Sequence, residues 1–200
     1  MLGFDMTIKL RYGNTNTFLV PCNGGYLLVD TDYAGTLPAL YKALKAAGVQ
    51  MKDIAYVLAT HYHPDHMGLI PELMKQGVRL LLMDTQTEDV HFSDQIFARE
   101  KALRFVPIDE SEAKVVSCHE SRAFLAGIGI AGEINSTPSH SRDSVSLILD
   151  DGDCIVGDLE PMEYLSAYGE NPALKADWDA IMNFCPKRIL YSHGNEKVFT

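Results

Sequence analysis

The sequence contains few cysteines, and they form no recognisable pair. The four cysteines, at positions 22, 118, 154 and 185, are widely separated and include no Cys-x-x-Cys motif. A disulfide framework is therefore not expected, because disulfide-rich folds are small and their cysteines lie close together in sequence. The apolar surroundings of Cys154 and Cys185 predict that both are buried as small hydrophobic side chains.

Long apolar runs and clustered basic residues are also absent. No stretch approaches the roughly 20 apolar residues of a spanning helix, and residues 1–10 show no basic region followed by a signal core. We therefore expect a cytoplasmic protein with no membrane partner. The 17 Lys and Arg against 27 Asp and Glu give a net charge of −10. This argues against a nucleic-acid partner, which requires clustered cations.

The chain has 200 residues, of which 46% are hydrophobic and 22% charged, as in an ordinary globular protein. It shows no linker, low-complexity tract or short repeat, so residues 1–200 are expected to form one domain. Apolar patterning predicts strands over residues 6–12, 16–22, 26–29, 54–59, 78–83, 114–118, within 122–135, 144–149, 154–156 and 188–191. Helices are predicted over residues 37–47, 69–76, 85–104 and 172–184. This order favours two packed sheets covered by helices.

The stretch 61–66, His-Tyr-His-Pro-Asp-His, holds three of the seven histidines and directly follows the apolar run 54–59. Such a density of imidazole and carboxylate groups is costly to bury unless a cation holds them. A metal site is the first hypothesis, and a polar loop of hydrogen-bonded histidines is the alternative.

Further ligand-type residues stand just past the carboxyl ends of other predicted strands, where α/β sheets place their ligand sites. His140 follows the strand expected near residues 129–135, Asp158 follows 154–156, and His193 follows 188–191. The full candidate set is His61, His63, Asp65, His66, His140, Asp158 and His193. Five imidazoles and two carboxylates are too many for one tetrahedral ion and suit two.

These motifs, in this order, resemble those of the metallo-β-lactamase superfamily: His-x-His-x-Asp-His, Thr137-Pro138-Ser139-His140, Gly157-Asp158 and Ser192-His193-Gly194. Asp30 also resembles the early strand-end aspartate of that family. The resemblance implies an α/β (α+β) fold, an αββα sandwich of two mixed sheets flanked by helices, with the site along one edge.

Carried over by position, the resemblance implies that His61, His63 and His140 bind a first metal. Asp65, His66 and His193 would bind a second, and Asp158 would bridge the two ions. Asp30 and Thr60 would hold imidazoles through their remaining N–H groups. Asp65 is also expected to orient the nucleophile and so to act in catalysis.

A ligand set of nitrogen and oxygen atoms suits zinc and tolerates iron or manganese. Two cations sharing a water generate hydroxide near neutral pH, which would attack a carbonyl group. In the lactamases themselves a cysteine commonly stands at the position of Asp158. Its absence, with no export signal in the sequence, argues against an antibiotic-degrading enzyme.

Several other residues have both a functional and a structural interpretation. Tyr33, Tyr62, Tyr164 and Tyr168 would line the cleft or donate a proton to a leaving group, or would simply pack. Met162, Tyr164 and Leu165 follow Asp158 closely and would form an apolar wall for the substrate. Arg142 would meet an anionic substrate group or pair with Asp143. His91 and His119 are expected on the surface, and Trp178 in the core.

The leading functional hypothesis is a metallo-hydrolase of small esters, thioesters or lactones. The first alternative is an iron protein with redox or oxygen-handling chemistry, since relatives use nearly the same ligands. The second is a phosphodiesterase or nuclease, although an acidic chain suits polyanions poorly. The third is a metal-binding homologue without activity.

Overall fold

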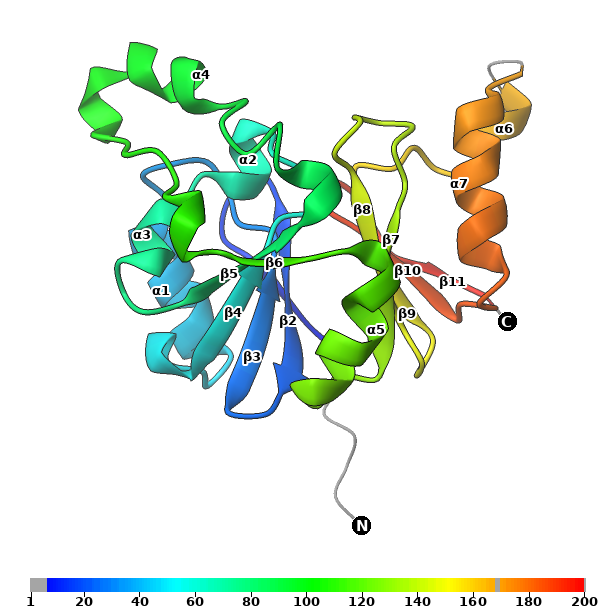
Figure 1. Ribbon diagram of the computed structural model, residues 1–200, viewed down its shortest axis with the longest axis horizontal. Coiled ribbons are helices and arrows are strands. Elements are labelled where there is room, and N and C mark those ends of the chain that lie inside the picture. The colour runs from blue at the N-terminus through cyan, green and yellow to red at the C-terminus, as the bar shows by residue number, and fades with distance from the viewer. Residues whose placement is uncertain (1–6, 168–169, 200) are drawn as a thin grey trace.

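Two mixed β-sheets lie face to face between helices in the computed structural model, which describes residues 7–167 and 170–199 (Figure 1). The first sheet follows chain order: β1 (Ile8–Arg11), β2 (Asn16–Cys22), β3 (Gly25–Val29), β4 (Ile54–Leu58), β5 (Arg79–Met83) and β6 (Lys114–Val116). The second has the order β11 (Lys197–Val198), β10 (Arg188–Tyr191), β9 (Asp153–Gly157), β8 (Val145–Leu149) and β7 (Gly132–Ser136). The predicted αββα arrangement is confirmed.

Seven α-helices within the described residues cover the outer faces and edges of the sheets. They are α1 (Leu37–Ala46), α2 (Pro64–Met67), α3 (Ile70–Met74), α4 (Asp94–Arg99), α5 (Cys118–Gly127), α6 (Tyr164–Ala167) and α7 (Pro172–Met182). In Figure 1, α1 and α3 flank the first sheet and α7 flanks the second. None of the helices in these described ranges combines the length and apolar character needed to cross a membrane.

Alternation along the strands divides the apolar residues among three cores, because successive side chains point to opposite faces of a sheet. Between the sheets, Leu27 and Leu58 meet Leu147 and Ile155. On the outer face of the first sheet, Leu28 and its neighbours pack under α1 and α3. On the outer face of the second sheet, β8, β9 and β10 pack against α7, including Trp178, which is buried as predicted.

Parallel pairing brings several strand ends to one edge of the sandwich. β3 pairs parallel with β4, and β9 pairs parallel with β10. Backbone bonds then join the ends of the strands: Asp30 N–H donates to Leu58 O (2.8 Å), and Ser192 N–H donates to Gly157 O (3.0 Å). The candidate ligands that follow these strands are therefore delivered to the same edge.

One predicted element was wrong, and one helix was not predicted. Residues 85–104 form short helical turns around α4 rather than one helix, and Asp84 and Thr87 bond nearby backbone groups through their side chains. Such bonds compete with helix formation. The strand expected within 122–135 is present as β7, and the helix α5, which was not predicted, occupies the residues before it.

The burial prediction holds for one cysteine and fails for the other. Cys154 lies in β9 and is fully buried. Cys185 is exposed, with a φ of 50° in the turn after α7. An apolar sequence context indicates burial within a regular element, but it does not do so at a helix end where the chain reverses.

Candidate metal centre

Each of the candidate strand-end residues lies just after the last residue of a strand. His61 follows β4 after Ala59 and Thr60, Asp158 directly follows β9, and His193 follows β10 after Ser192. Gly157 permits this convergence: its φ is 60°, and a Cβ there would lie 2.4 Å from Thr60 Oγ1. A glycine before Asp158 is thus required by both backbone conformation and space.

The short helix α2 orients the rest of the His-x-His-x-Asp-His motif. His63 is its N-cap residue, and Pro64 occupies the first turn, where its missing N–H costs nothing. Asp65 and His66 lie within the helix, so one turn of backbone directs three ligand-type side chains towards the strand ends.

The first three residues assigned to one ion lie together. His61 Nε2 is 3.0 Å from His63 Nδ1, and His140 Nε2 is 3.3 Å from that same atom. Their ligand atoms all lie within 4.8 Å of one another. Three nitrogen atoms facing a common point form a geometry that an imidazole-binding cation can occupy.

The second set is also assembled. His193 Nε2 is 3.0 Å from Asp65 Oδ2, and His66 Nε2 is 3.9 Å from Asp65 Oδ1. Their ligand atoms likewise lie within 4.8 Å of one another. This group combines two imidazoles with one carboxylate.

Asp158 lies between the two sets. Its Oδ1 is 3.4 Å from His66 Nε2 and 3.5 Å from His193 Nε2, whereas its Oδ2 is 3.8 Å from His140 Nε2. One carboxylate oxygen thus faces the second set and the other faces the first. This is the placement that a carboxylate shared by two ions would require.

Two orphaned polar atoms test whether these residues fit a metal. His66 Nε2 and Asp158 Oδ1 face each other at 3.4 Å, and both are buried without forming a hydrogen bond. Buried polar groups normally have partners, and exceptions need an explanation such as an ion. The imidazole and carboxylate donor set is also the chemistry that divalent first-row metals take. The residues fit.

Protonation differs between the two sets. Burial, followed by the neighbouring His66 and His63, holds the pKa of His61 far below its usual value, so it stays neutral. Burial also lowers the pKa of His66, but Asp30 and Asp158 outweigh this and raise it to about 10. The hydrogen bond from His193 lowers the pKa of Asp65 to about 2. A cation that binds His66 would displace the proton from this ring.

A buried carboxylate anchors the strand ends behind the centre. Asp30 is fully buried and accepts Thr60 N–H (2.6 Å), Thr60 Oγ1–H (2.9 Å) and Ser192 Oγ–H (2.7 Å). It also lies 2.9 Å from His66 Nδ1. An acceptor at Nδ1 places the ring proton there and leaves Nε2 facing the centre. Thr60 Oγ1 in turn lies 3.2 Å from His61 Nδ1.

The turn between β1 and β2 supports the second set from the opposite side, and sequence reasoning missed it. His193 Nδ1 lies 3.2 Å from the Asn14 carbonyl oxygen, and Thr15 Oγ1 donates to the Asp65 carbonyl oxygen (2.7 Å). Asn16 Nδ2 donates to the carbonyl oxygens of Tyr191 and Gly194, both at 2.9 Å. In the sequence, Asn14, Thr15 and Asn16 form a polar triplet between apolar runs, a pattern that indicates a turn but no contact with the ligands.

Replacing Asn16 with alanine is expected to weaken the second metal position selectively. Loss of two buried hydrogen bonds should reduce the free energy of unfolding by about 2 kcal/mol, and metal affinity should fall by about tenfold. Asn14→Ala is the matched control, since its contact to His193 uses only the main chain. Metal titration of both variants checks this; equal affinities would contradict it.

The tyrosines proposed for the cleft differ in position where the structure describes them. Tyr62 is fully buried, and its hydroxyl has no partner. Tyr33 Oη–H donates to Glu100 Oε1 (2.6 Å), and this bond raises the pKa of Tyr33 to about 12. Tyr164 is 40% exposed, and Tyr168 lies outside the described residues.

Tyr62→Phe is expected to leave turnover within about twofold of wild type and to raise stability by about 1 kcal/mol, because it removes a buried hydroxyl without a partner. Urea unfolding and steady-state kinetics measure the two effects. A rate loss comparable to that of a ligand substitution would instead give Tyr62 a catalytic role.

The remaining candidates around the centre also have clear positions. Arg142 pairs with Asp89 (2.8 Å) and Glu88 (3.2 Å) rather than with Asp143. Asp143 is buried and accepts Tyr62 N–H (2.7 Å). His91 and His119 are exposed, as predicted.

The apolar wall expected beside Asp158 is made of other residues. Met162 and Leu165 pack against the Trp178 core instead of lining the adjacent cavity. An aromatic side chain not anticipated from the sequence, Phe92, is 53% exposed and packs on His63 with ring centroids 5.2 Å apart.

Comparison with known proteins matches this architecture. The family model described as the metallo-beta-lactamase superfamily matches residues 10–193. The lactamase-like protein nscB of Trichophyton rubrum is 27% identical over 156 residues, covering 74% of this chain and 41% of its own length. The putative diflavin flavoprotein A 2 of Synechocystis is 29% identical over 97 residues, 48% of this chain and 16% of its own. The chain thus spans less than half the length of these relatives.

Solved structures show the same fold. A metallo-beta-lactamase family protein from Thermus thermophilus superposes with a TM-score of 0.64 at 20% identity, covering 96% of this chain and 74% of that one. The protein TTHA1623, solved in a di-iron-bound form, gives a TM-score of 0.66 at 23% identity, with coverages of 96% and 94%. The fold predicted from the motifs is confirmed.

Proposed function

The chain belongs to the metallo-β-lactamase superfamily, and on that premise we propose that it is a metal-dependent hydrolase of a small carbonyl substrate, an ester, thioester or lactone. The observation that carries this proposal is the position of Asp158, whose two oxygens face two separate groups of ligand-type side chains. Such a carboxylate suits a pair of ions rather than one.

In the proposed centre, His61, His63 and His140 would hold one divalent ion, and Asp65, His66 and His193 would hold the other, with Asp158 lying between the two groups. When bound, such ions supply Lewis acidity that polarises a carbonyl group and makes water nucleophilic near neutral pH. We propose zinc, and iron or manganese suits the same donor set.

The side chains around the ions have defined tasks in this proposal. Asp65 is half-exposed, and its low pKa keeps it ionised, so it can accept a hydrogen bond from a water molecule and orient it. Asp30 and the Asn14 carbonyl group fix the rings of His66 and His193 through their Nδ1 atoms. Rings held in this way lose little entropy when the site is filled.

The partner we propose is a small molecule rather than a nucleic acid. The net charge of −10 opposes the approach of a polyanion. An iron-dependent redox role is the second candidate, because one relative carries the name putative diflavin flavoprotein A 2 and because imidazole and carboxylate ligands also bind iron.

Metal analysis of protein purified without added metal, combined with a substrate panel, tests the proposal. We expect about two divalent ions per chain and hydrolysis of p-nitrophenyl acetate or a lactone, with little hydrolysis of bis-p-nitrophenyl phosphate. Iron with visible absorbance and no hydrolysis would favour the redox alternative. Protein that binds no zinc, iron or manganese would contradict both.

A further inference from the structure

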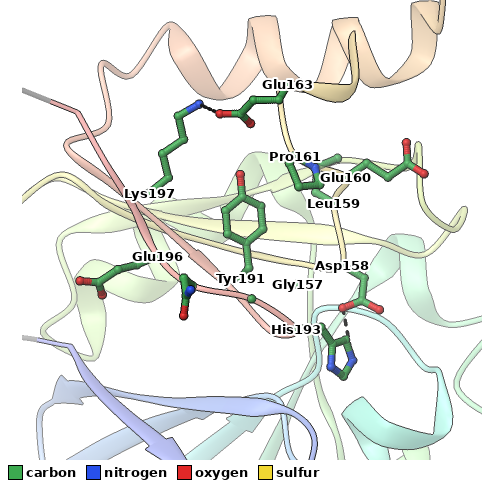
Figure 2. Close-up of a pocket in the computed structure, with 12 residues that line it drawn as sticks. Gly157, Asp158, Leu159, Glu160, Pro161, Glu163, Tyr191, His193, Glu196 and Lys197 are labelled. Atoms are coloured by element: carbon green, nitrogen blue, oxygen red, sulfur yellow. Dashed lines mark hydrogen bonds and ion pairs between the residues drawn. The ribbon is translucent and has the colours of Figure 1, made fainter. Parts of the chain in front are cut away.

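A cavity of about 510 Å³ opens beside the candidate centre. Its lining includes both Asp158 and His193, and it extends from them along the segments that follow β9 and β10 (Figure 2). The volume falls within the roughly 300–1,000 Å³ of small-molecule sites. A substrate whose reacting group lies at the centre would therefore place another part of itself in this cavity.

The inner wall of the cavity is apolar and firmly held. Leu159, Pro161 and Tyr191 line it, and Leu159 is buried. The carbonyl group of Glu160 accepts a hydrogen bond from Trp178 Nε1 (2.9 Å), which ties the wall to α7. Tyr191 is only 8% exposed, and its hydroxyl oxygen is buried, so this side chain presents no accessible polar atom to the cavity. The wall thus favours an apolar group.

The charges at the rim do not favour an anion. Lys197 is the one lysine or arginine in the described lining, and it forms an ion pair with Glu163, as Figure 2 shows. Glu160 adds negative charge to the same lining, whereas Glu196 pairs with Arg188 (3.5 Å). Beyond the cavity, the Arg142 guanidinium beside His140 is occupied by two carboxylates.

We propose that this cavity is the subsite for the uncharged, apolar part of the substrate, and that Glu163 excludes anionic substrates by neutralising Lys197. The inference rests on the proposed function, since it names the class of ester, thioester or lactone that the centre hydrolyses. The recognised group is an aliphatic chain or ring without a carboxylate.

A matched pair of esters tests the proposal on the metal-loaded protein. p-Nitrophenyl pentanoate and mono-p-nitrophenyl glutarate differ only in a terminal methyl or carboxylate group. We expect wild type to prefer the pentanoate ester. In Glu163→Gln, Lys197 is freed, and the glutarate-to-pentanoate ratio of kcat/KM should rise about fivefold, mainly through KM. The double variant Glu163→Gln/Lys197→Met should return the ratio to the wild-type value.

Comparing the glutarate-to-pentanoate ratio between wild type and the variants measures the effect of the Glu163–Lys197 pair alone. Direct attraction of the carboxylate by the metal ions is common to wild type and variants, so it cancels when their ratios are compared. An unchanged glutarate-to-pentanoate ratio in Glu163→Gln would overturn the proposal.

A second pair of compounds separates this inference from the proposed function. Hexan-2-one and 5-oxohexanoate differ in the same terminal group but cannot be hydrolysed, and NMR titration measures their binding. One outcome would support the subsite but not the hydrolase proposal: neither ester is hydrolysed, yet wild type binds hexan-2-one more tightly than 5-oxohexanoate. In that case Glu163→Gln should reduce the difference in affinity between the two compounds. If wild type and Glu163→Gln each bind the two compounds with equal affinity, the subsite proposal is wrong, whatever the ester kinetics show.

Discussion

Asp158→Ala is expected to abolish binding of two ions and to lower kcat/KM at least about a thousandfold, equivalent to roughly 4 kcal/mol of transition-state stabilisation. The reason is geometric: Asp158 is the only one of the seven candidate residues whose two carboxylate oxygens face different metal-binding groups, Oδ1 towards His66 and His193 and Oδ2 towards His140. Removing it affects both positions together. Metal content per chain and steady-state kinetics, measured on the same preparation, give the result.

The fold should survive this change. Asp158 lies at the mouth of the centre with a side chain 19% exposed, outside the three apolar cores. Far-UV circular dichroism and cooperative unfolding should therefore resemble those of metal-free wild type. Asp179→Ala is the control carboxylate, since Asp179 lies on α7 in a surface pair with Lys175, and such pairs contribute little. It should keep both metal and activity.

His63→Ala offers an independent check on the first group alone. His63 Nδ1 lies between His61 Nε2 and His140 Nε2, so its loss should empty the first position, and turnover should fall with it. An Asp158 or His63 variant with full metal content and full activity would refute that residue's role.

The strand-end positions explain why so much of the candidate centre could be inferred from the sequence. Parallel pairing of β3 with β4 and of β9 with β10 brings their carboxyl ends to one edge. A residue just after such a strand, as His61, Asp158 and His193 are, is then placed by backbone topology alone. The structure brings all seven candidates to that edge.

The two regions of the fold that were mispredicted, α5 and residues 85–104, have different causes. The helix α5 has a readable signal, because Ser117 and Glu120 form a Ser-x-x-Glu start in which Ser117 Oγ accepts Glu120 N–H (3.3 Å). Apolar residues within 122–135 masked that signal. In contrast, the breakdown of residues 85–104 into short turns involves Ser93 donating to the distant Tyr62 carbonyl group (2.6 Å), which a local pattern cannot predict.

The ion pairs around the centre could not be predicted from the sequence either. Arg142 stands next to Asp143, yet its partners are Asp89 and Glu88, more than 50 residues away. Likewise, the turn at Asn14 and Asn16 contacts residues near the C-terminus. These contacts arise only once the two sheets are stacked, and they determine which charges remain free to meet a substrate.

The largest stability effect is expected at Asp30, which joins the ends of β3, β4 and β10 to α2. Asp30→Ala leaves four groups without their acceptor: Thr60 N–H, Thr60 Oγ1–H, Ser192 Oγ–H and the Nδ1 atom of His66. Unsatisfied buried donors of this kind cost about 3–5 kcal/mol in total. The φ of 59° at this position adds roughly 1 kcal/mol for alanine, because L-residues other than Gly, Asn and Asp avoid the left-handed region.

Metal affinity should fall with stability, by about 10- to 100-fold, since the ring of His66 loses the carboxylate that orients it. Ser192→Ala provides a graded control: it removes one donor and leaves Asp30 its other three contacts, so it should cost only about 1 kcal/mol. Urea unfolding of the metal-free proteins gives the stability difference, and metal titration well below the unfolding temperature gives the affinity. If Asp30→Ala proved no more destabilising than Ser192→Ala, or bound metal as tightly as wild type, Asp30 would not be the anchor of this edge.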